Sequence, residues 1–393
     1  MSLLRALGLF YSSFLFLVAV FFLTEKQAIS GALNFESKSL EGKNQQVMGQ
    51  EAGEVELSIE QLVSRLIWFA PQGVELSKKE RSLMQKGKVG GVFLVGRNIG
   101  NQEQVEQLVR QVQELGAFVA IDQEGGSVSR LPWVEKTPQR EIATEVEAFN
   151  IAQTRGGQLR QLGIRMNLAP VVEVARDLCQ GRTLGNCQGP TFIENRAFVT
   201  DNGRLAAAMV KGYLEAGIIP VAKHFPGGLG RVAENPHRTL PIINFAQVGP
   251  VYETGPRPGL RSDFLKRLEE DLEPFRAVVA AQVPAIMVTH ILYPELDKMP
   301  ASASQIFMDD ILKGRLGFTG LVVVDDLSMA AVKDNYEVGE YAVQSLKAGA
   351  DLVLVSDFAD YERIVTAVTD AVEQGELNRE WLLEAHAKLE ELF

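Results

Sequence analysis

The stretch NGRLAAAMVKGYLEAGIIPVAKHF, residues 202–225, contains the pattern that decides the fold. Its first part places apolar residues at helical spacing and stops at Gly217, and its second part is a short apolar run typical of a buried strand. A helix followed by a buried strand is the repeating unit of a parallel α/β fold. Lys223 and His224 interrupt the apolar run near its end, which puts polar side chains where the strand stops.

The same alternation recurs along most of the chain. Helical patterns such as QEQVEQLVRQVQELG separate short apolar runs of strand length. The runs are LIWFA (66–70), GGVFLV (90–95), AFVAID (117–122), IRMNLAP (164–170), IIPVAKHF (218–225), AIMVTH (285–290), LVVVDD (321–326) and DLVLVS (351–356). Eight such units in a chain of 393 residues predict one α/β domain, a (β/α)8 TIM-like barrel over 57–393, rather than two domains.

The N-terminal segment differs in composition from the barrel region. Arg5 precedes an apolar run over residues 7–23, so residues 1–30 are predicted to be an export signal, either a cleaved signal peptide or a retained membrane anchor. The polar, aperiodic stretch 31–56 is predicted to be a linker. We therefore expect an exported protein that is periplasmic, secreted or attached to the membrane through residues 7–23.

Charge and cysteine content restrict the partners. A net charge of -11 leaves no basic surface of the kind that a phosphate backbone requires, so nucleic acid is not expected. Cys179 and Cys187 flank one short loop, and in an exported protein a disulfide between them is favoured over two free thiols. The histidines lack the spacing of a zinc site, and neither a metal nor a cofactor is expected.

Polar residues stand at the C-terminal ends of four of the predicted strands. They are Asp122, Lys223, His224, His290 and Asp325. In barrel enzymes this end carries the active site, so we expect these side chains to converge on one pocket. A carboxylate kept ionised by a nearby lysine and histidine is suited to covalent attack on an electrophilic carbon such as an anomeric centre.

The tandem Asp325-Asp326 allows two interpretations. Successive strand residues point to opposite faces, so only one of the two carboxylates can face the pocket. The competing interpretation is that one of them caps a helix expected from about Leu327. The long loop after Phe225 offers Glu234 and His237 as the proton donor that glycoside hydrolysis also requires.

Five blocks of the sequence resemble the signature blocks of glycoside hydrolase family 3. They are IDQEGGSVSRL (121–131), MNLAPVVEV (166–174), IENRAF (193–198), KHFPGG (223–228) and GFTGLVVVDDLSM (317–329). The resemblance is strongest to the single-domain β-N-acetylhexosaminidases that trim N-acetylglucosamine from peptidoglycan fragments. It implies a retaining mechanism with Asp325 as the nucleophile of a covalent intermediate. It also implies that the sugar is held by Asp122, Arg130, Arg196, Lys223 and His224.

The loop after Phe225 departs from the family pattern. Relatives typically read KHFPGHG and then Asp-Ser-His, whose aspartate and histidine form the acid/base dyad; here Gly228 replaces the first histidine. Asn235-Pro236-His237 stands in place of the tripeptide, so the aspartate is missing, and either His237 or Glu234 is left as the donor.

Two further positions differ, since Ser127 stands where relatives commonly have arginine and Glu173 where they have aspartate. These departures leave two main hypotheses. The first is an exported hexosaminidase with a modified acid/base loop, and the second is a catalytically weak, glycan-binding descendant. A β-glycosidase of other specificity is a third alternative.

Overall fold

The computed structural model describes residues 57–173 (except 88), 193, 196–198, 203–231, 234–243 and 260–393. The predicted export segment, the linker and the Cys179–Cys187 disulfide lie outside the described residues and stay predictions. In the part of the chain that is described, no helix combines the length and the apolar character needed to cross a bilayer.

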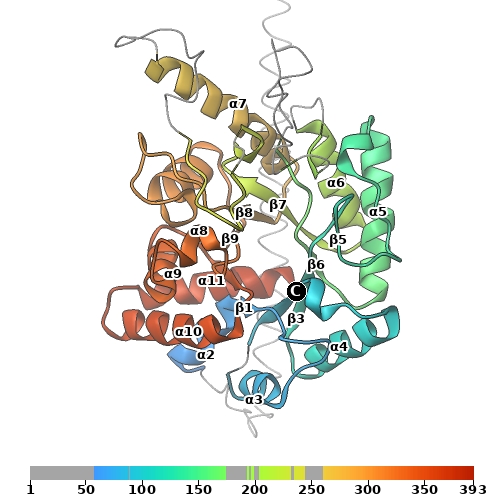
Figure 1. Ribbon diagram of the computed structural model, residues 1–393, viewed down its shortest axis with the longest axis vertical. Helices are drawn as coiled ribbons and strands as arrows, with labels where there is room; N and C mark the ends of the chain where they lie inside the picture. Colours follow the sequence, from blue (N-terminus) through green and yellow to red (C-terminus); the bar gives the residue numbers. More distant parts are fainter. Residues whose placement is uncertain are drawn as a thin grey trace, which may run out of the picture. The chain divides into compact units, whose positions relative to one another are not determined.

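Eight parallel strands close into one barrel (Figure 1). They are β1 Ile67–Phe69, β2 Gly91–Leu94, β3 Phe118–Ile121, β6 Met166–Asn167, β7 Ile219–Phe225, β8 Ala285–Val288, β9 Leu321–Val324 and β10 Leu352–Val355. β10 pairs with β1 and closes the ring. Nearly every strand residue is buried, which is why these parallel strands are continuous apolar runs in the sequence. Each strand lies within one of the eight predicted runs, so the predicted barrel is confirmed.

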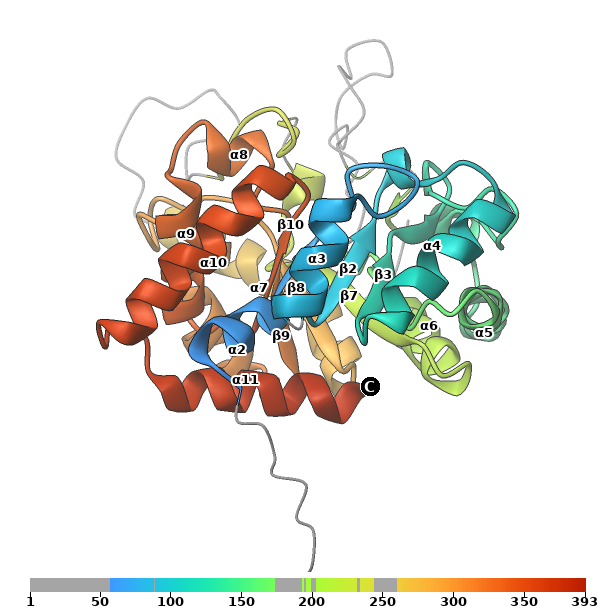
Figure 2. The same ribbon diagram turned by 90° about the horizontal axis from the view of Figure 1, so that it is seen from below.

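Helices surround the barrel (Figure 2). The α-helices are α2 Ile59–Leu66, α3 Lys78–Gly87, α4 Gln102–Glu114, α5 Glu145–Gln161, α6 Arg204–Glu215, α7 Leu260–Ala280, α8 Ala330–Lys333, α9 Val338–Lys347, α10 Phe358–Glu373 and α11 Arg379–Leu392. The short 3-10 helices are η1 Gly96–Asn98, η2 Gln139–Glu141, η4 Leu229–Arg231 and η6 Ala301–Ala303. The helix η7 Ile306–Arg315 is a π-helix. Several helices begin at side-chain caps, such as Asn101 for α4, Thr144 for α5 and Asn378 for α11.

α5 and α6 lie side by side (Figure 1 and Figure 2). Two glycines allow the backbones of these helices to approach each other closely. A Cβ atom on Gly212 would lie 2.3 Å from the carbonyl oxygen of Phe149, and one on Gly156 would lie 2.8 Å from the Cβ of Ala216. Any larger residue at either position would separate the helices.

α11 covers the N-terminal end of the barrel. The ring of Phe393 stacks on Phe118, at the start of β3, with ring centroids 3.7 Å apart. Lys388 Nζ lies 2.9 Å from Asp351 Oδ1, just before β10. The opposite end, where the strands finish, is built from loops that carry the polar side chains.

Candidate active site

A two-stranded hairpin, β4 Gln123–Gly125 and β5 Val128–Ser129, follows β3 directly. The side chain of Asn167, at the end of β6, holds the backbone of Gln123 to the barrel: Gln123 N–H donates to Asn167 Oδ1, and Asn167 Nδ2 donates to Gln123 O, each at 3.0 Å. The turn uses Gly125, with φ of +99°, where a Cβ atom would lie 2.2 Å from Thr137 O. The hairpin therefore holds the chain from Asp122 to Glu124 at the barrel mouth.

A buried arginine of the outer helix α5 binds this hairpin and the loop next to it. Arg155 Nη1 donates to Glu124 O at 2.5 Å, Nη2 donates to Thr137 O at 2.9 Å, and Nε donates to the Glu135 carboxylate at 2.9 Å. Arg155 is fully buried, so each of these bonds satisfies a donor that water cannot reach. The main chain at Glu124 is thus fixed by a helix on the outside of the barrel.

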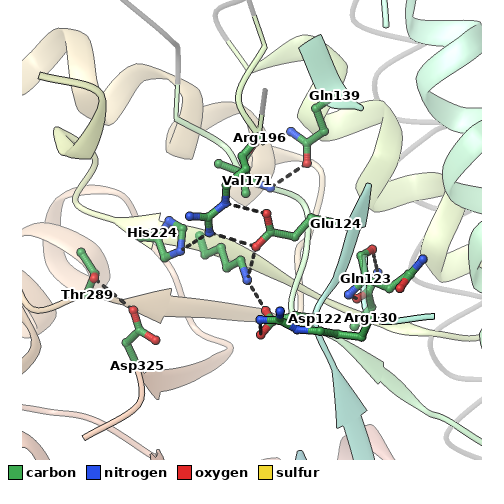
Figure 3. Close-up of polar contacts among 12 residues, drawn as sticks. Asp122, Gln123, Glu124, Arg130, Gln139, Val171, Arg196, His224, Thr289 and Asp325 are labelled. Atoms are coloured by element: carbon green, nitrogen blue, oxygen red, sulfur yellow. Dashed lines mark hydrogen bonds and ion pairs between the residues drawn. The ribbon is translucent and has the colours of Figure 1, made fainter. Parts of the chain in front are cut away.

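Glu124 binds two cations at the centre of the mouth (Figure 3). Its carboxylate accepts Arg196 Nε at 2.8 Å and Arg196 Nη2 at 3.0 Å, and it lies 2.7 Å from Lys223 Nζ. Burial alone would raise the pKa of Glu124, but Arg196 and then Lys223 outweigh it and lower the pKa to about 2. Glu124 is therefore ionised and fixes two cationic side chains before any ligand arrives.

Asp122 extends this cluster toward solvent. Lys223 Nζ donates to Asp122 Oδ1 at 2.5 Å, and Arg130 Nη2 lies 3.6 Å from Asp122 Oδ2. The Asp122 side chain is 18% exposed, whereas that of Glu124 is fully buried. Burial lowers the pKa of Lys223, but Asp122 and Glu124 outweigh it, so Lys223 stays charged. Carboxylate and ammonium groups at the surface of such a cluster are suited to paired hydrogen bonds with sugar hydroxyls.

His224 is held between an arginine and a carboxyl group. Arg196 Nη2 lies 3.3 Å from His224 Nε2, and Glu173 Oε1 lies 3.0 Å from His224 Nδ1. Arginine can only donate, so Nε2 accepts and Nδ1 carries the proton that it donates to Glu173. Burial, Arg196 and Lys223 lower the pKa of His224 well below its usual value, so the ring is neutral. The Lys223–His224 peptide bond is cis.

Asp325 follows β9 directly and faces the same mouth (Figure 3). Its Oδ2 accepts Thr289 Oγ1 at 3.1 Å, and its Oδ1 accepts the Asp326 N–H at 2.8 Å. Burial would raise the pKa of Asp325, but His224, His290 and the Asp326 N–H outweigh it and lower the pKa. Asp325 is therefore an ionised carboxylate at the rim.

Asp326 has a different environment and a structural role. Its Oδ1 accepts the backbone N–H groups of Ser328 at 2.9 Å and Ser356 at 2.7 Å, which ties the ends of β9 and β10 together. Burial raises the pKa of Asp326. The predicted capped helix from about Leu327 is wrong, because α8 begins at Ala330 and its N-cap residue Met329 makes no side-chain cap. The carboxyl of Asp326 forms a turn and not a helix cap.

His290 lies in the interior and not in the cluster of Asp122, Glu124, Arg196 and Lys223. Its Nε2 is 3.2 Å from Asp326 O, and its Nδ1 is 2.6 Å from Ser302 Oγ, which in turn is 2.7 Å from the Tyr341 hydroxyl. A carbonyl oxygen can only accept, so Nε2 carries the ring proton and Nδ1 accepts from Ser302. His290 thus holds the main chain next to Asp325, and the expectation that it converges on the pocket with the other four residues is corrected.

The loop with the candidate proton donors reaches the nucleophile side of the mouth. Asn235 Oδ1 accepts the backbone N–H of His237 at 2.9 Å, so this amide oxygen forms the turn. Ala331 N–H donates to Pro236 O at 3.2 Å, which attaches the turn to α8, shortly after Asp325. The exposed His237 lies near enough to Asp325 to contribute to its lowered pKa. Glu234 is half-buried at the start of the turn and remains the alternative donor.

The structure brings together all five residues predicted to hold a sugar, and it adds three residues that were not predicted for the site. The additions are Glu124, Glu173 and Thr289. Glu124 stands two residues after Asp122 and both bind Lys223, so this spacing was a usable signal. In the described part of the chain, no three histidine, cysteine or acidic side chains are grouped as metal ligands.

Comparison with known proteins identifies the family. The model of the glycosyl hydrolase family 3 N terminal domain matches residues 54–250 and 252–392. A β-hexosaminidase of Xanthomonas oryzae pv. oryzae is 32% identical over 325 residues, which are 78% of this chain and 86% of that protein.

Solved structures agree with this match. A glycoside hydrolase family 3 β-N-acetylglucosaminidase from Paenibacillus sp. has a TM-score of 0.73 and 31% identity, over 86% of this chain and 62% of that one. A β-N-acetylhexosaminidase from Beutenbergia cavernae has a TM-score of 0.66 and 27% identity, over 86% of this chain and 98% of that one. The chain thus spans less than two thirds of the Paenibacillus protein but nearly all of the Beutenbergia protein. Because the family model matches almost the whole barrel region, the chain belongs to glycosyl hydrolase family 3.

Proposed function

We propose that this glycoside hydrolase is a retaining β-N-acetylhexosaminidase that removes terminal N-acetylglucosamine from glycans, with peptidoglycan fragments as its natural substrates. The observation that carries the proposal is the barrel mouth itself. An ionised Asp325 lies at the same rim as the preformed cluster of Asp122, Glu124, Arg196 and Lys223. The name of the Paenibacillus relative supports N-acetylglucosamine as the sugar, and the name of the Xanthomonas relative supports a hexosaminide substrate.

Asp325 acts as the nucleophile in this proposal. Each of its oxygens accepts one hydrogen bond in the free enzyme, from Thr289 and from the Asp326 N–H, so lone pairs remain for attack. A bond forms between Asp325 and the anomeric carbon while the glycosidic bond breaks and the leaving oxygen receives a proton. Water then attacks the same carbon, and the carboxylate of Asp325 departs.

His237 supplies the proton in the first step and removes one from water in the second. An imidazole can both donate and accept a proton, so one group can perform both steps. Asn235 cannot stabilise the imidazolium as a carboxylate would, and its oxygen is already used by the backbone of His237. We therefore expect slow turnover of substrates whose leaving group needs a full proton.

The cluster of Asp122, Glu124, Arg196 and Lys223 favours catalysis because its side chains are already held in place before a sugar binds. Arg196 and Lys223 are 8% and 3% exposed and are held by Glu124, so they lose little side-chain freedom when a sugar binds. In this proposal Asp122 and Arg130, which are more exposed, contact the hydroxyl groups of the ring.

The function is tested by turnover of a chromogenic N-acetylglucosaminide. We expect the wild type to be active and Asp325→Ala to keep less than about a thousandth of its rate while still binding N-acetylglucosamine. Asp351→Asn, which alters a buried carboxylate at the other end of the barrel, is the control and should keep the wild-type rate. A wild type that binds the sugar without turnover indicates the glycan-binding alternative, and faster turnover of a glucoside indicates another β-glycosidase specificity.

Export is a separate part of the proposal. The apolar run 7–23 behind Arg5 supports a barrel that acts outside the cytoplasm. Cell fractionation tests this, because protein found only in the cytosolic fraction contradicts it. Mass analysis of the mature chain distinguishes cleavage near residue 30 from a retained anchor.

A further inference from the structure

Glu173 contacts two parts of the site that are otherwise separate. It lies just after the end of β6, beside β7, and its side chain is 2% exposed. One carboxyl oxygen, Oε1, lies 3.0 Å from His224 Nδ1. The other oxygen, Oε2, accepts the backbone N–H of Leu229 at 2.8 Å.

The first contact determines the protonation of His224. The guanidinium of Arg196 faces Nε2 and can only donate, so the ring must carry its proton on Nδ1 and needs an acceptor there. Glu173 Oε1 is that acceptor. Without it, a ring held by Arg196 on one side would leave its Nδ1 proton buried and unpaired.

The second contact determines where the donor loop begins. Leu229 is the first residue of η4, and the chain then leads to the turn of Asn235 and His237. Between β7 and Leu229 stand Gly227 and Gly228, both with positive φ, which any side chain would strain. The hydrogen bond from Leu229 to Glu173 therefore anchors the loop at a point only five residues after His224.

We propose that Glu173 is a positioning residue that joins the sugar-contacting ring of His224 to the start of the loop carrying His237. The assignment of His224 and His237 to the reaction rests on the proposed function, whereas the two hydrogen bonds of Glu173 do not. Two charged groups, Arg196 and Asp271, act on Glu173 through space, and the neutral ring of His224 contacts it directly. Burial raises the pKa of Glu173 to about 8, partly offset by the Leu229 N–H and Arg196.

Glu173→Gln is the sharpest test because it keeps the shape and removes one acceptor. A carboxyl group, ionised or protonated, has two oxygens that can accept, whereas a glutamine has one, because its amide nitrogen only donates; it can therefore accept from His224 or from Leu229 but not from both. The chain has four histidines, so imidazole nitrogen spectra can be assigned by substituting the other three in turn. We expect the wild type to show the Nδ1–H tautomer at His224 and slow amide hydrogen exchange at Leu229, and the variant to lose at least one of them.

Kinetics provides the second readout. We expect Glu173→Gln to lower kcat/KM roughly ten- to a hundred-fold, as misplaced catalytic groups do, with a larger loss on an N-acetylglucosamine disaccharide than on an activated aryl glycoside. Asp351→Asn is the matched control, since Asp351 is 2% exposed and also accepts a backbone N–H, from Val322 at 2.8 Å. It should lower stability without changing the substrate preference.

The outcomes separate this inference from the proposed function. A wild type without turnover removes the proposed function, while the tautomer and exchange measurements still decide the role of Glu173. If Glu173→Gln keeps both the His224 tautomer and the Leu229 protection, the bridge is refuted. If it loses them but its substrate preference matches that of Asp351→Asn, Glu173 is structural only, and the positioning role is refuted.

Discussion

Gly228 shows how a single residue restricts the donor loop. Its φ is +93°, and a Cβ atom there would lie 2.6 Å from the Tyr293 hydroxyl and 2.8 Å from Ile243 Cδ1. Tyr293 in turn donates to Gly227 O at 3.0 Å, so it cannot move away without losing a buried hydrogen bond. The left-handed backbone and these close contacts therefore require glycine at position 228 of this chain.

We predict that Gly228→Ala lowers the free energy of unfolding by roughly 1–3 kcal/mol, because it combines a left-handed backbone with overpacking. The control is Gly157→Ala in the middle of α5, where a Cβ atom meets nothing within 4 Å. That change should raise the free energy of unfolding by up to about 1 kcal/mol through helix propensity. Urea denaturation measures both, and equal stability of Gly228→Ala and the wild type contradicts the prediction.

The donor assignment gives a second prediction for single residues. We expect His237→Ala to lower kcat on a natural disaccharide by about 10²–10⁴-fold and to affect an activated aryl glycoside much less, because the aryl leaving group needs little protonation. Asn235→Asp should raise the rate on the disaccharide, since a carboxylate stabilises the imidazolium. The opposite pattern, with a neutral His237→Ala and a crippling Glu234→Gln, identifies Glu234 as the donor.

At the scale of elements, α5 determines the position of the β4–β5 hairpin. We predict that Arg155→Met lowers the free energy of unfolding by roughly 3–5 kcal/mol, because it leaves buried carbonyl groups and the Glu135 carboxylate without their cation. It should also speed hydrogen exchange in β4. Arg160→Met, on the exposed face of the same helix, is the control and should stay within about 0.5 kcal/mol of the wild type. Equal effects of the two changes would falsify this role of Arg155.

The sequence predicted the strands better than it predicted the connections. Parallel barrel strands are buried on both faces, so each appears as a continuous apolar run and could be located by composition alone. The β4–β5 hairpin escaped prediction because QEGGSVS has neither the length nor the alternation of ordinary strands. The start of α8 was also misplaced, since the Asx turn of Asp326 delays the helix to Ala330.

The sequence predicted which residues belong to the site better than it predicted the contacts between them. The barrel rule and the resemblance together placed Asp122, Lys223 and Asp325 at one rim. The contacts of Glu124 with Arg196 and of Glu173 with Leu229 join residues 72 and 56 positions apart, and no local pattern reveals such pairs. His290 shows the converse, because its strand-end position suggested the pocket while the fold uses it to support Asp326.

At the scale of the whole molecule, two buried carboxyl groups make stability depend on pH in opposite ways. The pKa of Glu124 is lowered from 4.5 to about 2, so its contribution to stability is present above pH 4.5 and is lost as pH falls toward 2. The pKa of Glu173 is raised from 4.5 to about 8, so its folded form binds a proton more tightly than the unfolded chain does. Its contribution is complete below pH 4.5 and is lost as pH rises toward 8.

We therefore predict that the melting temperature of the wild type falls between pH 5 and pH 8, and that Glu173→Gln makes this slope shallower. Ionising one fully buried carboxyl across that window changes the free energy of unfolding on the order of several kcal/mol, since each pKa unit corresponds to about 1.4 kcal/mol. The net charge of -11 adds repulsion as pH rises, but it acts on the wild type and on the variant alike. A difference between the two proteins in the slope of melting temperature against pH is therefore caused by Glu173, even if the variant is less stable at every pH.

Calorimetry at half-unit pH intervals measures this slope, with Asp351→Asn as the control that should keep the wild-type slope. Parallel curves for the wild type and Glu173→Gln would show that Glu173 is ionised throughout this range, and a protonated Glu173 at neutral pH would have to be abandoned.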